Sequence, residues 1–392
     1  MRSGARVHAS KRRARKPCQS SPFLAEHAFR TGAFTIESRF FRRRVRDVTA
    51  SNDPPLDALM HPFREGLLAS AADTLFLNAR GGDALPVQAR EWTCVQSFKP
   101  WADALAAQGL ASRSELPLES QRFARVLLLL PRQRDLARAS MVRGLQRLAD
   151  GGVLVASQAN DAGARSAASD LARLVSPLPS ASKHHCRVMW TAPQAVRADP
   201  ALEAEWLAQA APRPIPGTPW LGQPGVFARD RIDAGSALLA AHLPADLAGA
   251  AADLGAGWGF LSASLLRRCP GVTSVDLFEA DADALALARL NLAQEATSAA
   301  LHFHWHDVAA GLPGGFDVIV SNPPFHAGHA EDVELGRAFI AAAARALRPG
   351  GRFWLVANRH LPYETALAAG FASVREVVRA DGFKVIEARS AG

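Results

Sequence analysis

An asparagine, two prolines and a phenylalanine, Asn322-Pro323-Pro324-Phe325, follow Ser321 and an apolar run at residues 316–320. The length and branching of that run predict a buried strand. Two prolines cannot continue a hydrogen-bonded ladder, and they stiffen the backbone where the strand ends. Asn322 would present a carbonyl oxygen and an amide group in fixed positions, and an aromatic ring follows it closely. The pattern is typical of a site that grips a planar group bearing an amine, and the alternative is a strand that ends in a loop without chemistry.

A glycine-rich segment is a second candidate binding element. Gly255, Gly257 and Gly259 follow a predicted strand at residues 250–254 and precede a predicted helix. Glycines let the backbone turn sharply and let a ligand approach it closely. A dinucleotide-binding fingerprint requires a further glycine at the position where this chain has Phe260. The segment therefore predicts a ligand-binding loop and argues against NAD.

Three carboxylates lie at the ends of successive predicted strands: Asp253 beside the glycine loop, Glu279 at the end of residues 272–279, and Asp307 after residues 301–306. Open α/β sheets bind ligands at the edge formed by the carboxyl ends of their strands. Asp253 would repel a pyrophosphate but attract the ammonium of an amino acid. Glu279 can accept hydrogen bonds from both hydroxyls of a ribose, and Asp307 can accept one from an adenine amino group. S-adenosylmethionine carries all three groups, so the set predicts S-adenosylmethionine as the cofactor.

Alternating strand and helix patterns over residues 225–392 position these side chains. The predicted strands are residues 250–254, 272–279, 301–306, 316–320, 352–357, 372–378 and 383–388, and the predicted helices include residues 281–295 and 332–347. The last two strands flank Ala380-Asp381-Gly382, which predicts a hairpin turn. The pattern predicts a mostly parallel, doubly wound sheet of seven strands with a terminal antiparallel hairpin.

Residues 60–205 show a fainter form of the same pattern. Strand patterns at residues 125–130 and 153–157 flank helical spacing at residues 135–149, as they do around the corresponding helix of the second half. Where the second half has Asn-Pro-Pro-Phe, the first has Pro131-Arg132-Gln133-Arg134. We interpret the first half as a duplicated domain that has lost its chemistry, and the alternative is two similar α/β units that arose by chance. A Pro-rich linker is predicted at residues 206–224.

Several short motifs occur together in the second half. They are Gly225-Val226-Phe227-Ala228-Arg229-Asp230, Asp233-Ala234-Gly235-Ser236, the glycine loop, Ser321 to His326, Val356-Ala357-Asn358, Leu361-Pro362-Tyr363 and Gly382-Phe383-Lys384-Val385. Because of these motifs, residues 225–392 resemble the class I methyltransferases, and more narrowly the ribosomal RNA guanine-N2 methyltransferases of the small- and large-subunit type. The resemblance implies two tandem Rossmann-like domains, the first of which is degenerate and serves RNA binding or folding. Phe227 either covers the cofactor or simply packs against neighbouring side chains. Trp258 is bulkier than the residues that are usual in such a glycine loop.

The resemblance implies methyl transfer from S-adenosylmethionine to the exocyclic N2 amine of a guanine in ribosomal RNA or a ribosomal subunit. The Asn322 side-chain oxygen and the Pro323 carbonyl would accept the two N–H groups of the amine, Pro324 would stiffen the turn, and Phe325 would stack on the base. Catalysis would then be mainly alignment. No metal is expected: three histidines share one face of the strand at residues 301–306, but no second cluster accompanies them.

Two alternatives remain open. The same chemistry acts on DNA adenine N6 or on a protein glutamine amide in relatives that more often have tyrosine where this chain has Phe325. The chain could instead be a non-catalytic RNA-binding assembly factor, although the intact Asn322 and glycine loop argue against that class. The sequence names neither the ribosomal subunit, nor the nucleotide, nor the oligomeric state.

Cysteine usage and hydropathy indicate the compartment. The chain has 392 residues, and no apolar run approaches the roughly 18 residues that a membrane span requires. The four cysteines, Cys18, Cys94, Cys186 and Cys269, are widely scattered and predict neither a disulfide framework nor a zinc knuckle. We therefore expect a cytoplasmic protein without a membrane partner.

The net charge of +8 comes from the amino-terminal end of the chain. The first 50 residues hold 13 Lys or Arg and 3 Asp or Glu, whereas the other 342 hold 32 and 34. Residues 1–59 are predicted to be a disordered basic tail, which binds RNA phosphates or else precedes a natural start at Met60. An organellar presequence is a weaker alternative. The remainder is nearly neutral, so the high net charge is poor evidence that the folded part binds nucleic acid.

Overall fold

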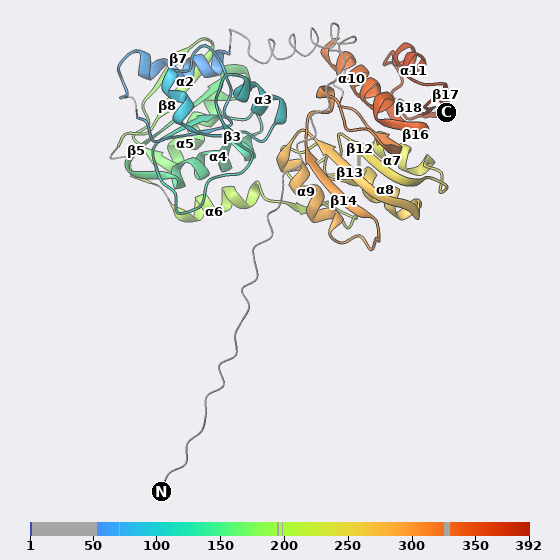
Figure 1. Cartoon of the computed structure of the whole chain (residues 1–392). Helices are drawn as coiled ribbons and strands as arrows, with labels where there is room; N and C mark the ends of the chain where they lie inside the picture. Colours follow the sequence, from blue (N-terminus) through green and yellow to red (C-terminus); the bar gives the residue numbers. More distant parts are fainter. Residues whose placement is uncertain (2–52, 70, 194–195, 198, 325–329) are drawn as a thin grey trace. The chain divides into compact units, whose positions relative to one another are not determined.

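The computed structural model describes residues 1, 53–69, 71–193, 196–197, 199–324 and 330–392. The described residues from 53 onward contain two seven-stranded sheets (Figure 1). Each sheet pairs mostly parallel strands, and the second sheet carries the motifs with candidate chemistry.

The second sheet has the strand order β14-β13-β12-β15-β16-β18-β17. Its strands are β12 (Ala248–Leu254), β13 (Gly271–Glu279), β14 (Ala300–Trp305), β15 (Phe316–Ser321), β16 (Leu347–Asn358), β17 (Ser373–Ala380) and β18 (Phe383–Arg389). Strands β12 to β16 pair in parallel, and β18 is antiparallel to both of its neighbours. The predicted parallel sheet with a terminal hairpin is confirmed.

Helices cover both faces of this sheet, because successive residues of a buried strand point to opposite faces. Val318 and Val320 of β15 belong to the core beneath α7 (Ala234–His242), α8 (Phe260–Arg268) and α9 (Ala282–Leu292). Ile319 belongs to the core beneath α10 (Ala330–Ala346) and α11 (Glu364–Gly370). The result is a three-layer sandwich whose central strands end at the glycine loop and at Asn322 (Figure 1).

The first sheet repeats this order as β3-β2-β1-β4-β5-β8-β7. Its strands are β1 (Thr74–Leu77), β2 (Thr93–Val95), β3 (Ser112–Arg113), β4 (Phe123–Leu129), β5 (Leu148–Ala159), β7 (Ser180–Lys183) and β8 (Cys186–Trp190). The helices around it are α2 (Pro54–Arg64), α3 (Lys99–Ala107), α4 (Arg134–Gln146), α5 (Ala164–Leu174) and α6 (Pro200–Gln209). Two sheets with one strand order favour duplication over chance similarity, since many other orders are possible for seven strands.

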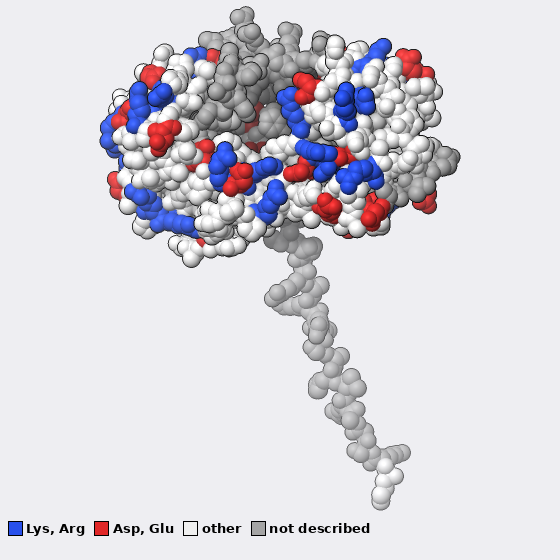
Figure 2. Space-filling model, turned by 180° about the vertical axis from the view of Figure 1, so that it is seen from behind, with Lys and Arg blue, Asp and Glu red and all other residues white. Residues whose placement is uncertain are grey.

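Short elements complete the described residues. They are the 3₁₀ helices η1 (Val87–Glu91), η2 (Asn160–Ala162) and η3 (Val308–Ala310), and the strand pairs β6 (Val175–Ser176) with β9 (Val196–Arg197) and β10 (Arg213–Pro214) with β11 (Leu221–Gly222). No helix among the described residues is both long and apolar enough to cross a membrane. Figure 2 shows basic and acidic side chains interspersed on one face, in keeping with the small net charge of residues 51–392.

The structure corrects the predicted end of the tail at residue 59. Helix α2 begins at Pro54, where the Asp53 side chain accepts a hydrogen bond from the Leu56 N–H at 3.1 Å. Leu56 and Leu59 are buried in the core of the first domain. Residues 54–59 therefore belong to the fold, and residues 2–52 lie outside the described residues.

The structure also corrects the linker predicted at residues 206–224. Trp206 is fully buried in the core of the first domain, where the guanidinium groups of Arg138 and Arg173 lie over its ring. Ile215 and Trp220 are buried in the core of the second domain. The predicted linker therefore contains buried aromatic and aliphatic residues of both domains.

Candidate active site

The glycine loop turns sharply between β12 and α8. Gly255, Gly257 and Gly259 have φ values of +70°, +54° and +91°, in the left-handed region that favours glycine. A Cβ atom at Gly257 would meet nothing within 4 Å, so the space above its backbone is open. Gly259 is the residue before α8, which places the start of that helix beside the open space. The loop can therefore let a ligand approach its backbone.

Glu279 braces this loop from the end of β13. Its Oε2 accepts a hydrogen bond from the Gly257 N–H at 2.8 Å, and its Oε1 accepts one from the Asp281 N–H at 2.9 Å. Burial raises the pKa of the Glu279 carboxyl, while the backbone donors oppose that rise. A carboxylate oxygen can accept two hydrogen bonds, so each oxygen keeps acceptor capacity for a ligand hydroxyl.

Asp253 lies in β12 behind the glycine loop. Its side chain is fully buried, and the Ser262 hydroxyl donates a hydrogen bond to its Oδ2 at 2.7 Å. Its Oδ1 is buried without a hydrogen-bond partner among the described residues, and burial raises its pKa to about 7. Asp253 is not among the residues that line the hollow beside the loop. Asp253 can therefore act on a ligand in this hollow only through its charge, across the glycine loop.

Asp307 follows β14 and begins the 3₁₀ helix η3. Its Oδ1 accepts a hydrogen bond from the Ala309 N–H at 3.0 Å, and its side chain is half-buried. The structure thus places Asp307 at the predicted edge of the sheet and gives it a local capping role as well.

The hollow beside the glycine loop joins segments that are distant in the sequence. It is lined by Phe227, Ala228, Asp233, Ser236, Gly255, Ala256, Gly257, Trp258, Phe260, Leu261 and Asn322. The structure therefore brings Phe227, Gly255, Gly257 and Asn322 together at this hollow. Phe227 is 63% exposed, so its ring is not held by the core.

Asn322 is held in one orientation by two side chains that the sequence analysis gave no role. Its Nδ2 donates to Asp233 Oδ2 at 2.9 Å and to Ser236 Oγ at 2.8 Å. A carboxylate can only accept hydrogen bonds, so the NH₂ group must face Asp233 and the oxygen must face away. The Oδ1 of Asn322 is buried and has no partner among the described residues. The site thus contains a fixed, unsatisfied hydrogen-bond acceptor.

The local structure explains how Asp233 and Asn322 reach these positions. Asp233 caps α7, because its Oδ2 also accepts the Ser236 N–H at 2.8 Å. The Ser321 hydroxyl donates to the Leu254 carbonyl at 2.8 Å, which ties the ends of β15 and β12 together. The Asp-x-x-Ser spacing signals a helix start, but nothing local connects it with an asparagine 89 residues away.

The rest of the Asn-Pro-Pro-Phe motif is described only in part. Pro323 is buried and Pro324 is exposed, whereas Phe325 lies outside the described residues. The ring centroid of Trp258 lies 5.8 Å from that of Trp220 and 5.6 Å from that of Phe260. The bulky residue of the glycine loop is therefore accommodated by aromatic packing.

Other candidate residues have structural roles. Lys384 is 2% exposed, and its ammonium donates to the Leu361 carbonyl at 2.9 Å and pairs with Glu364. His304 stacks on Phe278 at 4.5 Å and hydrogen-bonds to Asp276. Among the residues that the structure describes, no group of three His, Cys, Asp or Glu side chains could hold a metal ion.

Comparison with known proteins places this site in a family. The family model of the methyltransferase small domain matches residues 218–387. Ribosomal RNA small subunit methyltransferase C of Ectopseudomonas mendocina is 34% identical over 280 residues, which cover 71% of this chain and 83% of that protein. The corresponding protein of Shewanella baltica is 30% identical over 272 residues, 69% of this chain and 77% of that protein.

A solved structure supports the same assignment. The Thermus thermophilus 16S rRNA N2 G1207 methyltransferase, in complex with AdoMet and guanosine, matches with a TM-score of 0.70 and 26% identity, over 86% of this chain and 92% of that chain. The family predicted from the sequence is confirmed: this chain is a class I methyltransferase that belongs to the family of ribosomal RNA small subunit methyltransferase C.

Proposed function

We propose that this enzyme transfers the methyl group of S-adenosylmethionine to the exocyclic N2 amine of a guanine in ribosomal RNA. One observation carries the proposal: Asp233 and Ser236 hold the amide of Asn322 so that a buried oxygen is left without a partner. A buried acceptor without a donor is costly, and the N–H of a base amine would satisfy it. The Thermus thermophilus relative, whose structure contains AdoMet and guanosine, supports the same substrate class.

The residues of the site fit the cofactor. The open space above Gly257 admits the chain of the amino acid, and Glu279 keeps acceptor capacity for the two ribose hydroxyls. Asp307 would accept the adenine amino group, and Phe227 would cover the ligand from the exposed side. Asp253 would attract the ammonium through the loop. When bound, S-adenosylmethionine supplies a methyl group on a positively charged sulfur, which is already a good leaving group.

The side chains of this enzyme mainly position the base. The lone pair of an exocyclic amine is delocalised into the ring, so the amine is a poor nucleophile. Two acceptors, Asn322 Oδ1 and the Pro323 carbonyl, would take its two N–H groups and direct the lone pair toward the methyl group. Pro324 would stiffen this turn, and Phe325 would stack on the base. Such alignment is worth several orders of magnitude in rate, and a paired guanine must first leave its helix.

The first domain would serve RNA binding or the folding of the second. It has the strand order of the catalytic domain, yet Leu130 and Pro131 follow β4 where Asn322 and Pro323 follow β15. Without a fixed amide at that point it lacks the proposed acceptor, so we infer one active site per chain. The partner would be ribosomal RNA or a ribosomal subunit in the cytoplasm.

Mapping of methylated guanines in ribosomal RNA tests this function. RNA from a strain that lacks the gene should lose one N2-methylguanosine, and the wild-type gene should restore it. The Asn322→Ala variant should fail to restore it, whereas Asn160→Ala, a matched change at an exposed asparagine of the first domain, should succeed. Loss of N6-methyladenine or of a methylated protein glutamine instead would favour the related chemistries, and no change in methylation would favour a non-catalytic assembly factor.

A further inference from the structure

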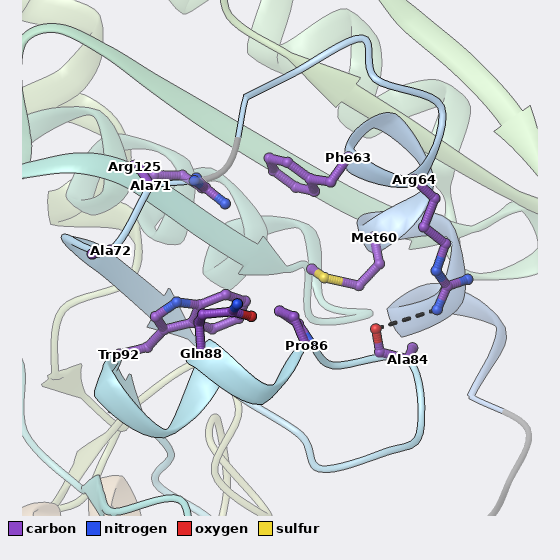
Figure 3. Close-up of a pocket in the computed structure, with 10 residues that line it drawn as sticks. All are labelled: Met60, Phe63, Arg64, Ala71, Ala72, Ala84, Pro86, Gln88, Trp92 and Arg125. Atoms are coloured by element: carbon purple, nitrogen blue, oxygen red, sulfur yellow. Dashed lines mark hydrogen bonds between the residues drawn. The ribbon is translucent and has the colours of Figure 1, made fainter.

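A second cavity, of about 450 Å³, lies in the first domain (Figure 3). Its walls come from α2, from residues 84–92, and from the residues around the starts of β1 and β4. The amino ends of parallel strands lie opposite the edge where α/β sheets bind nucleotides. The cavity is therefore not the counterpart of the glycine-loop site, and its volume is that of a small-molecule pocket.

One wall of this cavity carries a buried positive charge. Arg125 is 4% exposed, and Figure 3 shows its side chain beside Phe63, whose ring centroid lies 4.5 Å from the guanidinium carbon. Its Nη2 donates to the Ala69 carbonyl at 3.2 Å, and no carboxylate of the described residues forms an ion pair with it. Burial lowers the pKa of this guanidinium. A buried charge without a counter-ion is costly, and natural proteins usually pair it.

We propose that this cavity binds a small organic anion with a flat apolar body, the size of a nucleoside monophosphate or an aromatic carboxylic acid. The anionic group pairs with Arg125, and the flat body lies against Phe63 and Met60. Arg64 contributes to the wall while its Nη2 is held by the Ala84 carbonyl at 3.2 Å. A free metabolite and a single nucleotide of RNA share this chemistry.

Matched pairs of probes test the proposal on the full chain. Uridine 5′-monophosphate is compared with uridine, and indole-3-acetate with indole-3-acetamide, by isothermal titration calorimetry. The anion of at least one pair should bind about tenfold or more tightly than its neutral partner, because only the anion compensates Arg125. Arg125→Met should abolish that preference, and Arg122→Met, which removes an exposed charge three residues away, should preserve it.

Thermal unfolding of the free protein gives an independent readout. Arg125→Met should raise the melting temperature, because an apolar side chain of similar length replaces an uncompensated buried charge. Tight binding of a short oligouridylate that depends on Arg125 would identify RNA as the source, and binding of the small anions alone would identify a metabolite. Failure of all four probes to bind, equal affinity within both pairs, or affinities unchanged by Arg125→Met would overturn the proposal.

Discussion

Replacement of Asp233 by serine isolates the orientation of the Asn322 amide. Asp233 Oδ2 accepts hydrogen bonds from both the Ser236 N–H, at 2.8 Å, and Asn322 Nδ2, at 2.9 Å. Serine caps helices about as well as aspartate, so α7 should keep its start. The serine hydroxyl carries no charge and lies closer to the backbone, so the amide loses the acceptor that fixes its orientation.

The magnitude follows from that hydrogen bond. A hydrogen bond to a charged acceptor contributes about 1.5–3 kcal/mol, and a flipped amide would also set its oxygen against the Asp233 carboxylate. In Asp233→Ser the amide loses the hydrogen bond to the carboxylate, and the Ser236 hydroxyl, which can either donate or accept, does not replace it. The energy that placed the acceptor for the base amine is then missing from the transition state. We expect kcat to fall about 10- to 150-fold, the rate equivalent of that energy.

Single-turnover methyl transfer to ribosomal RNA from a strain that lacks the enzyme measures this effect. The Kd of S-adenosylmethionine should change less than about threefold, because Asp233 is a positioning residue for Asn322. Ser236→Ala removes only the uncharged acceptor, keeps the backbone N–H that Asp233 accepts, and should cost less than Asp233→Ser. A folded Asp233→Ser enzyme that binds the cofactor normally and keeps kcat within twofold of wild type would refute the reasoning.

Three further predictions concern the cofactor loop and the fold. Glu279→Gln should weaken S-adenosylmethionine about tenfold or more in calorimetry, because an amide has one acceptor oxygen where the carboxylate has two. Asp253, with a folded pKa of about 7 against an unfolded value near 4, binds a proton that the unfolded chain releases between those pH values. The unfolding free energy should therefore fall as pH rises from about 4 to 7, by at most about 1.4 kcal/mol per pH unit. Urea titrations of Asp253→Asn should lack this pH-dependent fall. An identical pH dependence in both proteins would contradict the raised pKa of Asp253. Lys384→Met should lower stability by about 1–3 kcal/mol, since the Leu361 carbonyl loses a charged donor, and should leave RNA affinity unchanged. A loss of RNA affinity at unchanged stability would instead indicate that Lys384 binds RNA.

The catalytic half of the fold was predictable because its strands are buried on both faces. Runs such as residues 316–320 are mostly apolar, and they end next to glycine, carboxylate or asparagine at the ligand edge. The Pro-Pro pair marked Asn322 as unusual, and the structure places it at the hollow with Gly255 and Gly257. Local pattern was sufficient for these features because each depends on one strand and its end.

The domain boundaries were predicted wrongly because proline is common both in irregular segments and in the first turn of helices. Asp53-Pro54-Pro55 was assigned to the disordered tail, yet Asp53 caps helix α2 and the prolines lie in its first turn. The short strands β2 and β3 were also missed, since two or three residues carry no periodicity.

The partners of Asn322 could not be found from local pattern. In the sequence, Asp233 has the pattern of an ordinary helix N-cap. Only the fold brings it to Asn322, which is 89 residues away. The cavity around Arg125 was missed for a similar reason. An arginine inside a predicted strand gives no sign that its charge lacks a counter-ion, which depends on the residues packed around it.

Methyl transfer by the purified enzyme, with Asn322→Ala as the test variant, probes the central claim most directly. Ribosomal RNA from a strain that lacks the enzyme is incubated with labelled S-adenosylmethionine, and the modified nucleoside is identified by mass spectrometry. The wild-type enzyme should yield N2-methylguanosine, and Asn322→Ala should lose at least about a hundredfold in rate while it binds the cofactor normally. An Asn322→Ala enzyme with undiminished transfer, or a wild-type product methylated on another base, would contradict the account.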